Sequence, residues 1–116
     1  MKNGLTITEG TIEGVHVLKL AGFLDGHTFI ELERKLDTLI KSGRSRIVAD
    51  LAGLTYIASA GVGAFINGQH QAKKNNGSVQ LARASSSVKE IFDILGLDAI
   101  FTIHATLPEG LKAAKE

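Results

Sequence analysis

The segment from Thr55 to Gly63 carries the side chain best suited to regulatory chemistry, the hydroxyl of Ser59. The segment joins an apolar run to a stretch with helical spacing, so Ser59 is expected to be the N-cap of a helix. A cap by itself would be a structural role. A phosphate on the same oxygen, however, would meet the unpaired amides and the positive end of the helix dipole. It would also add about 1.5 to 2 negative charges, enough to create or abolish an interface.

Three glycines in the same predicted helix, Gly61, Gly63 and Gly68, need an explanation, because each costs about 1 kcal/mol relative to alanine. Close approach of the helix to a neighbouring backbone, or to the surface of a partner, is the use that glycine has at such positions. No Lys, Arg, Asp or Glu occurs from residue 51 to residue 72. This pattern predicts a buried turn followed by a partner-facing surface.

Acidic residues near a serine raise the question of nucleophilic catalysis. Asp25 and Asp50 both end predicted strands and are expected to approach Ser59. A serine nucleophile normally also needs a base such as histidine. The candidate is His27, whose place in the Asp25 loop is better explained by turn chemistry. We therefore predict that both aspartates are structural first, with a role near a phosphoacceptor second, and that the protein is not an enzyme.

The sequence offers no cofactor or metal motif. Gly61-Val62-Gly63 after a strand resembles part of a dinucleotide fingerprint, but Ile66 replaces the third glycine, and the spacing of a P-loop is absent. Surface or edge positions, rather than a metal site, are expected for the four histidines, which are His16, His27, His70 and His104. A loop and an N-cap explain the serines at positions 85 to 87.

The first half of the chain predicts a hairpin, a helix and a central strand. Alternation at Leu5 and Ile7, a turn at Glu13-Gly14 and the apolar run 15–21 indicate the hairpin. The second strand changes phase, which indicates either a bulge or burial on both faces. A capping box at Thr28 begins a helix that ends near Gly43. The apolar run 47–49 predicts a strand that ends at Asp50-Leu51.

The second half alternates helices with strands. We predict a helix from residue 60 to about 75, a strand around residues 79–81, a helix from a capping box at Ser87 to Gly96 and a strand over 100–103. A capping box at Thr106, with Pro108 in the first turn, opens a last helix. The order predicts an α/β fold whose central sheet is mostly parallel, with an antiparallel N-terminal edge hairpin and about four helices.

Composition limits the classes of function. A chain of 116 residues, 44% hydrophobic and 22% charged, is expected to form one domain over residues 1–116. A net charge of +1 with no basic stripe argues against direct nucleic-acid binding. The absence of cysteine and of an apolar signal segment favours a cytoplasmic protein. No stretch is apolar enough for membrane insertion.

Several motifs together resemble the STAS domain family, and specifically its bacterial anti-sigma factor antagonists. The match covers nearly the whole chain. It includes Gly22-Phe23-Leu24-Asp25, the strand 47–51 that ends in aspartate-leucine, and Ala58-Ser59-Ala60-Gly61-Val62-Gly63. The last segment resembles the family's aspartate-serine-serine/threonine-glycine-leucine-glycine pattern, in which the first serine is the phosphoacceptor. That serine is Ser59 here, while Ala58 and Ala60 depart from the pattern.

The resemblance implies a protein that binds an anti-sigma factor, usually a serine kinase of the histidine-kinase-like ATPase fold, and so releases a sigma factor. Phosphorylation of Ser59 would end the interaction and a phosphatase would restore it. The surroundings expected to bind the partner are Asp25, Gly26, His27, Asp50, Ala58, Ala60, Gly61, Val62 and Gly63. The departures at Ala58 and Ala60 leave two alternatives open: a scaffold subunit of a stressosome-like or lipid-transport complex, and a small-ligand sensor.

Overall fold

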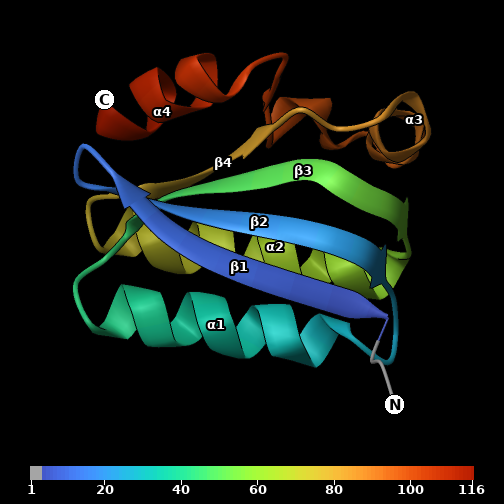
Figure 1. Ribbon diagram of the computed structural model, residues 1–116, viewed down its shortest axis with the longest axis horizontal. Coiled ribbons are helices and arrows are strands. Elements are labelled where there is room, and N and C mark those ends of the chain that lie inside the picture. The colour runs from blue at the N-terminus through green and yellow to red at the C-terminus, as the bar shows by residue number, and fades with distance from the viewer. Residues whose placement is uncertain (1–3) are drawn as a thin grey trace.

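A computed structural model describes residues 4–116 and shows a five-stranded sheet in the order β1-β2-β3-β4-β5 (Figure 1). The strands are β1 (Leu5–Ile12), β2 (Val15–Leu24), β3 (Arg46–Ile57), β4 (Ser78–Ala82) and β5 (Ile103–His104). β1 and β2 form the antiparallel hairpin, and the other neighbouring pairs are parallel. The predicted α/β architecture is therefore confirmed.

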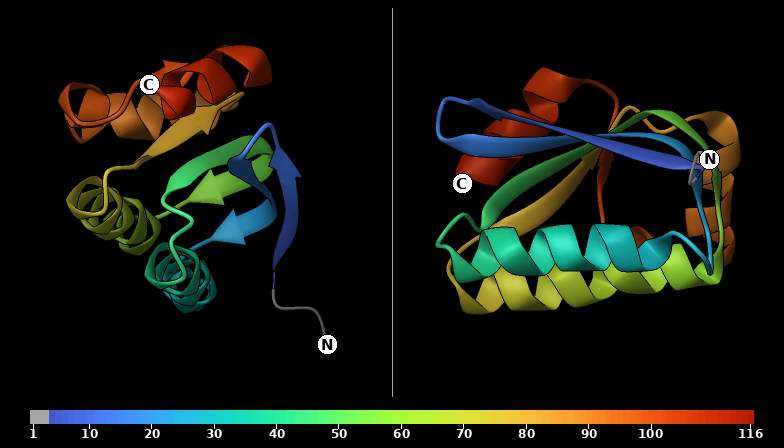
Figure 2. Two further views of the ribbon diagram at one scale, coloured as in Figure 1. Left: turned by 90° about the vertical axis from the view of Figure 1, so that its left-hand side faces the viewer. Right: turned by 60° about the horizontal axis from the view of Figure 1, so that its bottom comes forward.

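The helices cover both faces of the sheet. They are α1 (Phe29–Lys41), α2 (Ser59–Lys74), α3 (Ser86–Ile94) and α4 (Leu107–Lys115). α1 and α2 lie side by side on one face, while α4 covers the other (Figure 2). The larger core lies under α1 and α2, and α3 joins it through Phe92, which contacts Phe65 of α2. A smaller core beneath α4 includes Val48 and Ala114.

The central strand β3 is longer than the sequence predicted. Its pairing with β4 stops at Asp50, but it continues beside β2 as far as Ile57. Two register shifts in the β2–β3 pairing show that β3 carries extra residues there, and such bulges bend a strand. β2 also buries four consecutive residues from Val15 to Leu18. Burial on both faces therefore explains the phase change of β2, whereas the bulges lie in β3 and the pairing of β2 with β1 is uninterrupted.

The boundaries of three elements were predicted wrongly. Thr28 forms no capping box, because its own backbone is already helical and its hydroxyl accepts from the Asp25 amide instead. α3 is capped by Ser85, whose hydroxyl accepts from the Val88 amide, and not by Ser87. The last strand spans residues 103–104 rather than 100–103, because a 3-10 turn at Leu97–Ala99 buries Phe101 in the aromatic cluster.

The capping box at Thr106 is confirmed, with both reciprocal hydrogen bonds to Glu109 present.

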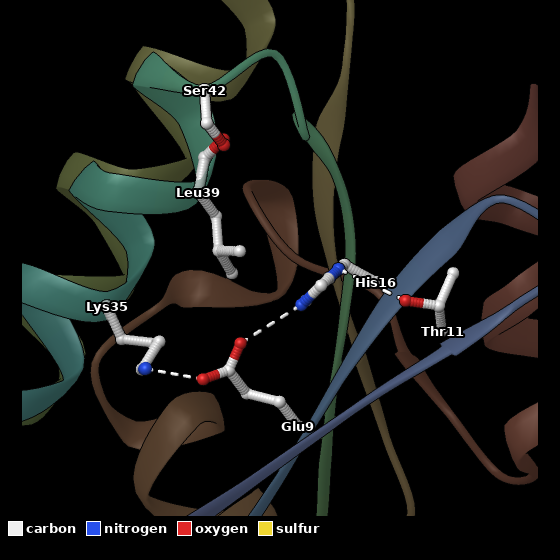
Figure 3. Close-up of polar contacts among 6 residues, drawn as sticks. All are labelled: Glu9, Thr11, His16, Lys35, Leu39 and Ser42. Carbon is white, nitrogen blue, oxygen red and sulfur yellow. Dashed lines mark hydrogen bonds and ion pairs between the residues drawn. The ribbon is translucent and has the colours of Figure 1, made fainter.

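The prediction of surface or edge histidines fails for His16, which is buried in β2. Its Nε2 lies 3.1 Å from the Glu9 carboxylate, which also pairs with Lys35 of α1 (Figure 3). Because these three residues come from β1, β2 and α1, the contact ties the hairpin to the first helix.

Candidate functional site

The site around Ser59 is built where the parallel strands β2 and β3 end. Their last paired residues are Leu24 and Ile57, and the Ala58 amide then donates to the Leu24 carbonyl at 2.9 Å. The chain after β2 forms the Asp25 loop, and the chain after β3 enters α2. The carboxyl ends of neighbouring parallel strands thereby bring residues 25–28 beside residues 58–61, although about thirty positions separate them in the sequence.

Ser59 is the first residue of α2 and not its N-cap. The N-cap is Ala58, which has extended backbone angles and a carbonyl that accepts from the amides of Gly61 and Val62. Alanine has no side-chain oxygen to offer the helix, so the predicted capping role of Ser59 is wrong. Ser59 is exposed, and its hydroxyl forms no hydrogen bond within residues 4–116. The amides of Ser59 and Ala60 precede the first helical hydrogen bond, which leaves this end of α2 able to stabilise an anion.

Gly61 lets α2 approach the end of β2. A Cβ atom at this position would lie 2.5 Å from Cγ of Leu24 and 3.1 Å from its carbonyl oxygen. Gly68 likewise lets α2 approach α1, since its Cβ would meet Leu36 at 2.7 Å. Gly63 differs, because it is exposed and a Cβ there would meet no neighbouring atom of residues 4–116 within 4 Å. Internal packing therefore explains two of the three glycines.

The Asp25 loop is held by its own aspartate. Oδ1 of Asp25 accepts from the backbone amides of His27 at 2.8 Å and Thr28 at 3.1 Å. These bonds, the one from His27 above all, hold the pKa of the Asp25 carboxyl below its ordinary value despite its partial burial. Thr28 in turn donates its hydroxyl hydrogen to the Phe23 carbonyl at 2.9 Å. These hydrogen bonds fix the shape of the loop, which presents Gly26 and His27 to solvent.

Asp50 is not part of this group. It lies in the interior of β3, seven residues before the end of the strand, which corresponds to roughly 20 Å of extended chain. Its buried carboxylate binds Arg83 through two hydrogen bonds, 3.0 Å to Nε and 2.6 Å to Nη2. Burial raises the pKa of Asp50, but the bonds from Arg83 and the Ala52 amide outweigh it, so the pKa is lowered. Arg83 has a φ of 60°, and no sequence motif indicated its role.

An exposed aromatic pair borders the site and was missed by the sequence analysis. Phe23 and Tyr56 precede Leu24 and Ile57 on the neighbouring strands β2 and β3, and their rings meet edge to face with centroids 6.4 Å apart. They are 52% and 50% exposed. Strand alternation could have signalled this arrangement, because it places Phe23 and Tyr56 on the face opposite to the buried Leu24 and Ile57.

The histidines and acidic residues of the described range do not form a metal site. Among residues 4–116 no three His, Asp or Glu side chains gather as a metal site would require. His27 and His70 are exposed, whereas His104 bonds to Gln80 at 3.0 Å. Over the same described range no helix is long and apolar enough to cross a membrane.

Comparison with known proteins identifies the fold that carries this site. Residues 7–110 match the STAS domain. The chain belongs to the STAS domain family. The putative anti-sigma factor antagonist BtrV of Bordetella bronchiseptica is 29% identical over 99 residues, 85% of each chain. The anti-sigma-B factor antagonist of Staphylococcus aureus is 26% identical over 100 residues, which cover 86% of this chain and 93% of that one.

Solved structures share the architecture of this STAS domain. An anti-sigma factor antagonist from Mycobacterium paratuberculosis superposes with a TM-score of 0.88 at 20% identity, covering 100% of this chain and 98% of that one. The unphosphorylated anti-sigma factor antagonist SpoIIAA gives a TM-score of 0.80 at 23% identity, covering 95% and 96%. At these identities the likeness establishes the fold.

Proposed function

We propose that this STAS domain is an anti-sigma factor antagonist whose binding is switched by phosphorylation of Ser59. It binds an anti-sigma factor that is a serine kinase of the histidine-kinase-like ATPase fold, and thereby releases a sigma factor. The observation that carries the proposal is the Ser59 hydroxyl, which is exposed, has no partner among the described residues and lies at the positive end of α2. Relatives named as anti-sigma factor antagonists support the assignment of partner class.

The surroundings of Ser59 suit a switch based on charge. The run 51–72 contains no Lys, Arg, Asp or Glu, and α2 has no acidic residue in its first turn. A phosphate would therefore be the dominant charge of the surface that Phe23, Tyr56 and the Asp25 loop border. It would be stabilised by the helix end, while a partner packed on this surface would have to desolvate it.

A scaffold is the second candidate, and the observation that favours it is the pair of alanines around Ser59. Ala58 and Ala60 replace the carboxylate and the hydroxyl residue of the family pattern, and neither offers a polar group to a kinase. A chain that is never phosphorylated would bind its partner constitutively. Phosphate transfer to Ser59 therefore separates the two candidates.

We expect a kinase-type anti-sigma factor from the same cell to bind unmodified protein and Ser59→Ala equally, and to bind Ser59→Asp at least tenfold more weakly. Isothermal titration calorimetry measures the affinities, and intact-mass spectrometry with site mapping follows phosphate transfer from ATP. Ser86→Asp is the matched control, because Ser86 is likewise exposed and likewise the first residue of its helix.

Phosphate on Ser59, together with weak binding of Ser59→Asp alone, supports the switch. Equal affinity of Ser59→Asp and Ser59→Ala, with no phosphate at Ser59, would leave the scaffold as the function.

A further inference from the structure

The sheet has one long edge that nothing covers within residues 4–116. β5, at one side, is two residues long and contacts α4. β1, at the other side, is eight residues long, pairs with β2 without interruption and lies at the outer edge of the sheet (Figure 2). Residues 8–12 are all exposed. An open edge of this length is a template for pairing with another strand.

β1 lacks most of the features that normally protect an edge. It contains no proline or lysine, and five of its eight residues, in the sequence LTITEGTI, are β-branched. Its one charge, Glu9, is turned under the sheet toward His16 and Lys35 (Figure 3). Natural edges are usually blocked by Lys, Pro, bulges or inward-pointing charges. Of these, β1 has only the inward-pointing Glu9, and Lys35 of the same chain pairs with its charge.

The direction of the free backbone groups follows from the hairpin. The Gly4 carbonyl accepts from the Phe23 amide, so Gly4 points its polar groups at β2. In an antiparallel ladder every second residue does the same, which assigns Thr6, Thr8 and Gly10 to β2. The N–H and C=O groups of Leu5, Ile7, Glu9 and Thr11 therefore point to the open edge. An added strand would find four evenly spaced residues to pair with.

We propose that the occupant of this edge is a second copy of the chain, paired antiparallel through β1 about a two-fold axis at Thr8. In an antiparallel pair, residues that lie opposite each other must point to the same face of the sheet. A two-fold axis at Thr8 meets this condition. It places Leu5 opposite Thr11 of the second copy and Ile7 opposite Glu9 of the second copy. Thr8 then lies opposite Thr8 of the second copy, a favourable cross-strand pair. The two sheets become one of ten strands.

Charge complementarity beneath the sheet favours a second copy over an unrelated strand. Ile7, Glu31, Arg34, Lys35 and Thr38 line a hollow of about 370 Å³ between β1 and α1. The same axis sets α1 of the second copy alongside α1 and antiparallel to it. The ion pair places Glu9 of β1 over Lys35 of α1. One strand residue spans about as much length as two helical residues, so Thr8 lies over residues 32–33 of α1. Glu31 and Arg34 of one helix thus face Arg34 and Glu31 of the other, as an isologous interface requires.

Single cysteines test both the contact and its register, because the chain has none of its own. Thr8 would face Thr8 as a non-hydrogen-bonded pair with Cα atoms about 4.5 Å apart, close to what a disulfide needs. Thr6 would lie about 14 Å from Thr6 of the second copy. We expect Thr8→Cys to form a disulfide-linked dimer under mild oxidation at least tenfold faster than the matched control Thr6→Cys, which lies on the same face of the same strand.

Sedimentation equilibrium measures the native association. The 12.3 kDa chain should reach twice its mass at high micromolar concentration, whereas Thr8→Lys should remain monomeric. Ala52→Lys is the control, because Ala52 lies on an exposed part of the central strand β3, and this variant should dimerise as the parent does. Circular dichroism checks that both variants fold. A native chain that stays monomeric at 500 μM, or equal cross-linking of Thr6→Cys and Thr8→Cys, would overturn the proposal. The test does not involve Ser59, so its failure leaves the antagonist proposal unaffected.

Discussion

At the scale of single residues, the glycines of α2 are of two kinds: two are required by packing inside the domain, and the third is exposed at the surface. Gly61 and Gly68 lie against Leu24 and Leu36, where a methyl group has no room. Gly63 is exposed and has ordinary helical surroundings with open space beside it. No packing contact inside the described part of the domain offsets the lower helix stability that glycine causes there. The surface in front of Gly63 is where the proposed partner would approach the backbone of α2.

Alanine at Gly63 and at Gly61 should therefore have opposite effects on stability. Gly63→Ala is expected to raise the free energy of unfolding by about 1 kcal/mol, and Gly61→Ala to lower it by about 1–3 kcal/mol because Leu24 must shift. Urea denaturation measures both. If Gly63 also makes room for the partner, Gly63→Ala will bind the anti-sigma factor more weakly despite its greater stability. A destabilised Gly63→Ala would contradict the open space seen beside that residue.

At the scale of elements, the ion pair between Asp50 and Arg83 fixes the crossing from β4 to α3. Arg83 immediately follows β4, and its guanidinium reaches back to a carboxylate in the middle of β3. Asp50 is 2% exposed, whereas the Arg83 side chain is 45% exposed. The pair thus holds a buried acid in its charged form and anchors a loop at the same time. That role accounts for an aspartate that lies far from Ser59.

Asp50→Asn should lower the free energy of unfolding at neutral pH by about 1–3 kcal/mol, because the buried carboxylate and its two charge-assisted hydrogen bonds to Arg83 are replaced by a neutral amide. Because the pKa of Asp50 is lowered on folding, its contribution is present above the unfolded value of 3.8 and is lost as the pH falls through the lower folded value. The difference between parent and variant in urea denaturation should therefore shrink between pH 5 and pH 2. A difference that stays constant over this range would contradict the charged state of Asp50.

At the scale of the whole molecule, the domain presents different surfaces at its two ends. The β1–β2 turn lies at one end, and the end of β2, the start of α1 and the start of α2 meet at the other (Figure 1). The second end gathers the hydrogen-bonded Asp25 loop, the Ser59 hydroxyl and the exposed rings of Phe23 and Tyr56. Aromatic residues dominate the energetics of many interfaces, so these rings are the expected anchors for the partner.

Tyr56→Ala is expected to weaken binding of the anti-sigma factor at least tenfold, because the ring is half exposed at the same end of the domain as Ser59 and would be buried by the partner. Ile12→Ala removes a similarly exposed apolar side chain at the end of β1, 39% exposed against 50% for Tyr56, and should change affinity less than twofold. Calorimetric titration compares the two. Equal losses would place the partner elsewhere on the domain.

The sequence by itself determined the order of the elements, the hairpin and the mostly parallel sheet, because apolar periodicity and turn residues are local signals. It also pointed to Ser59, through a motif that is contiguous in the chain. Only the tertiary structure decided that Ala58 rather than Ser59 caps α2, that Asp50 belongs to Arg83 and that Phe23 meets Tyr56. Each of these depends on the path of β3, whose bulges carry it past Asp50 to Ile57. Strand length and register are set by pairing with β2 and β4, which no local pattern contains.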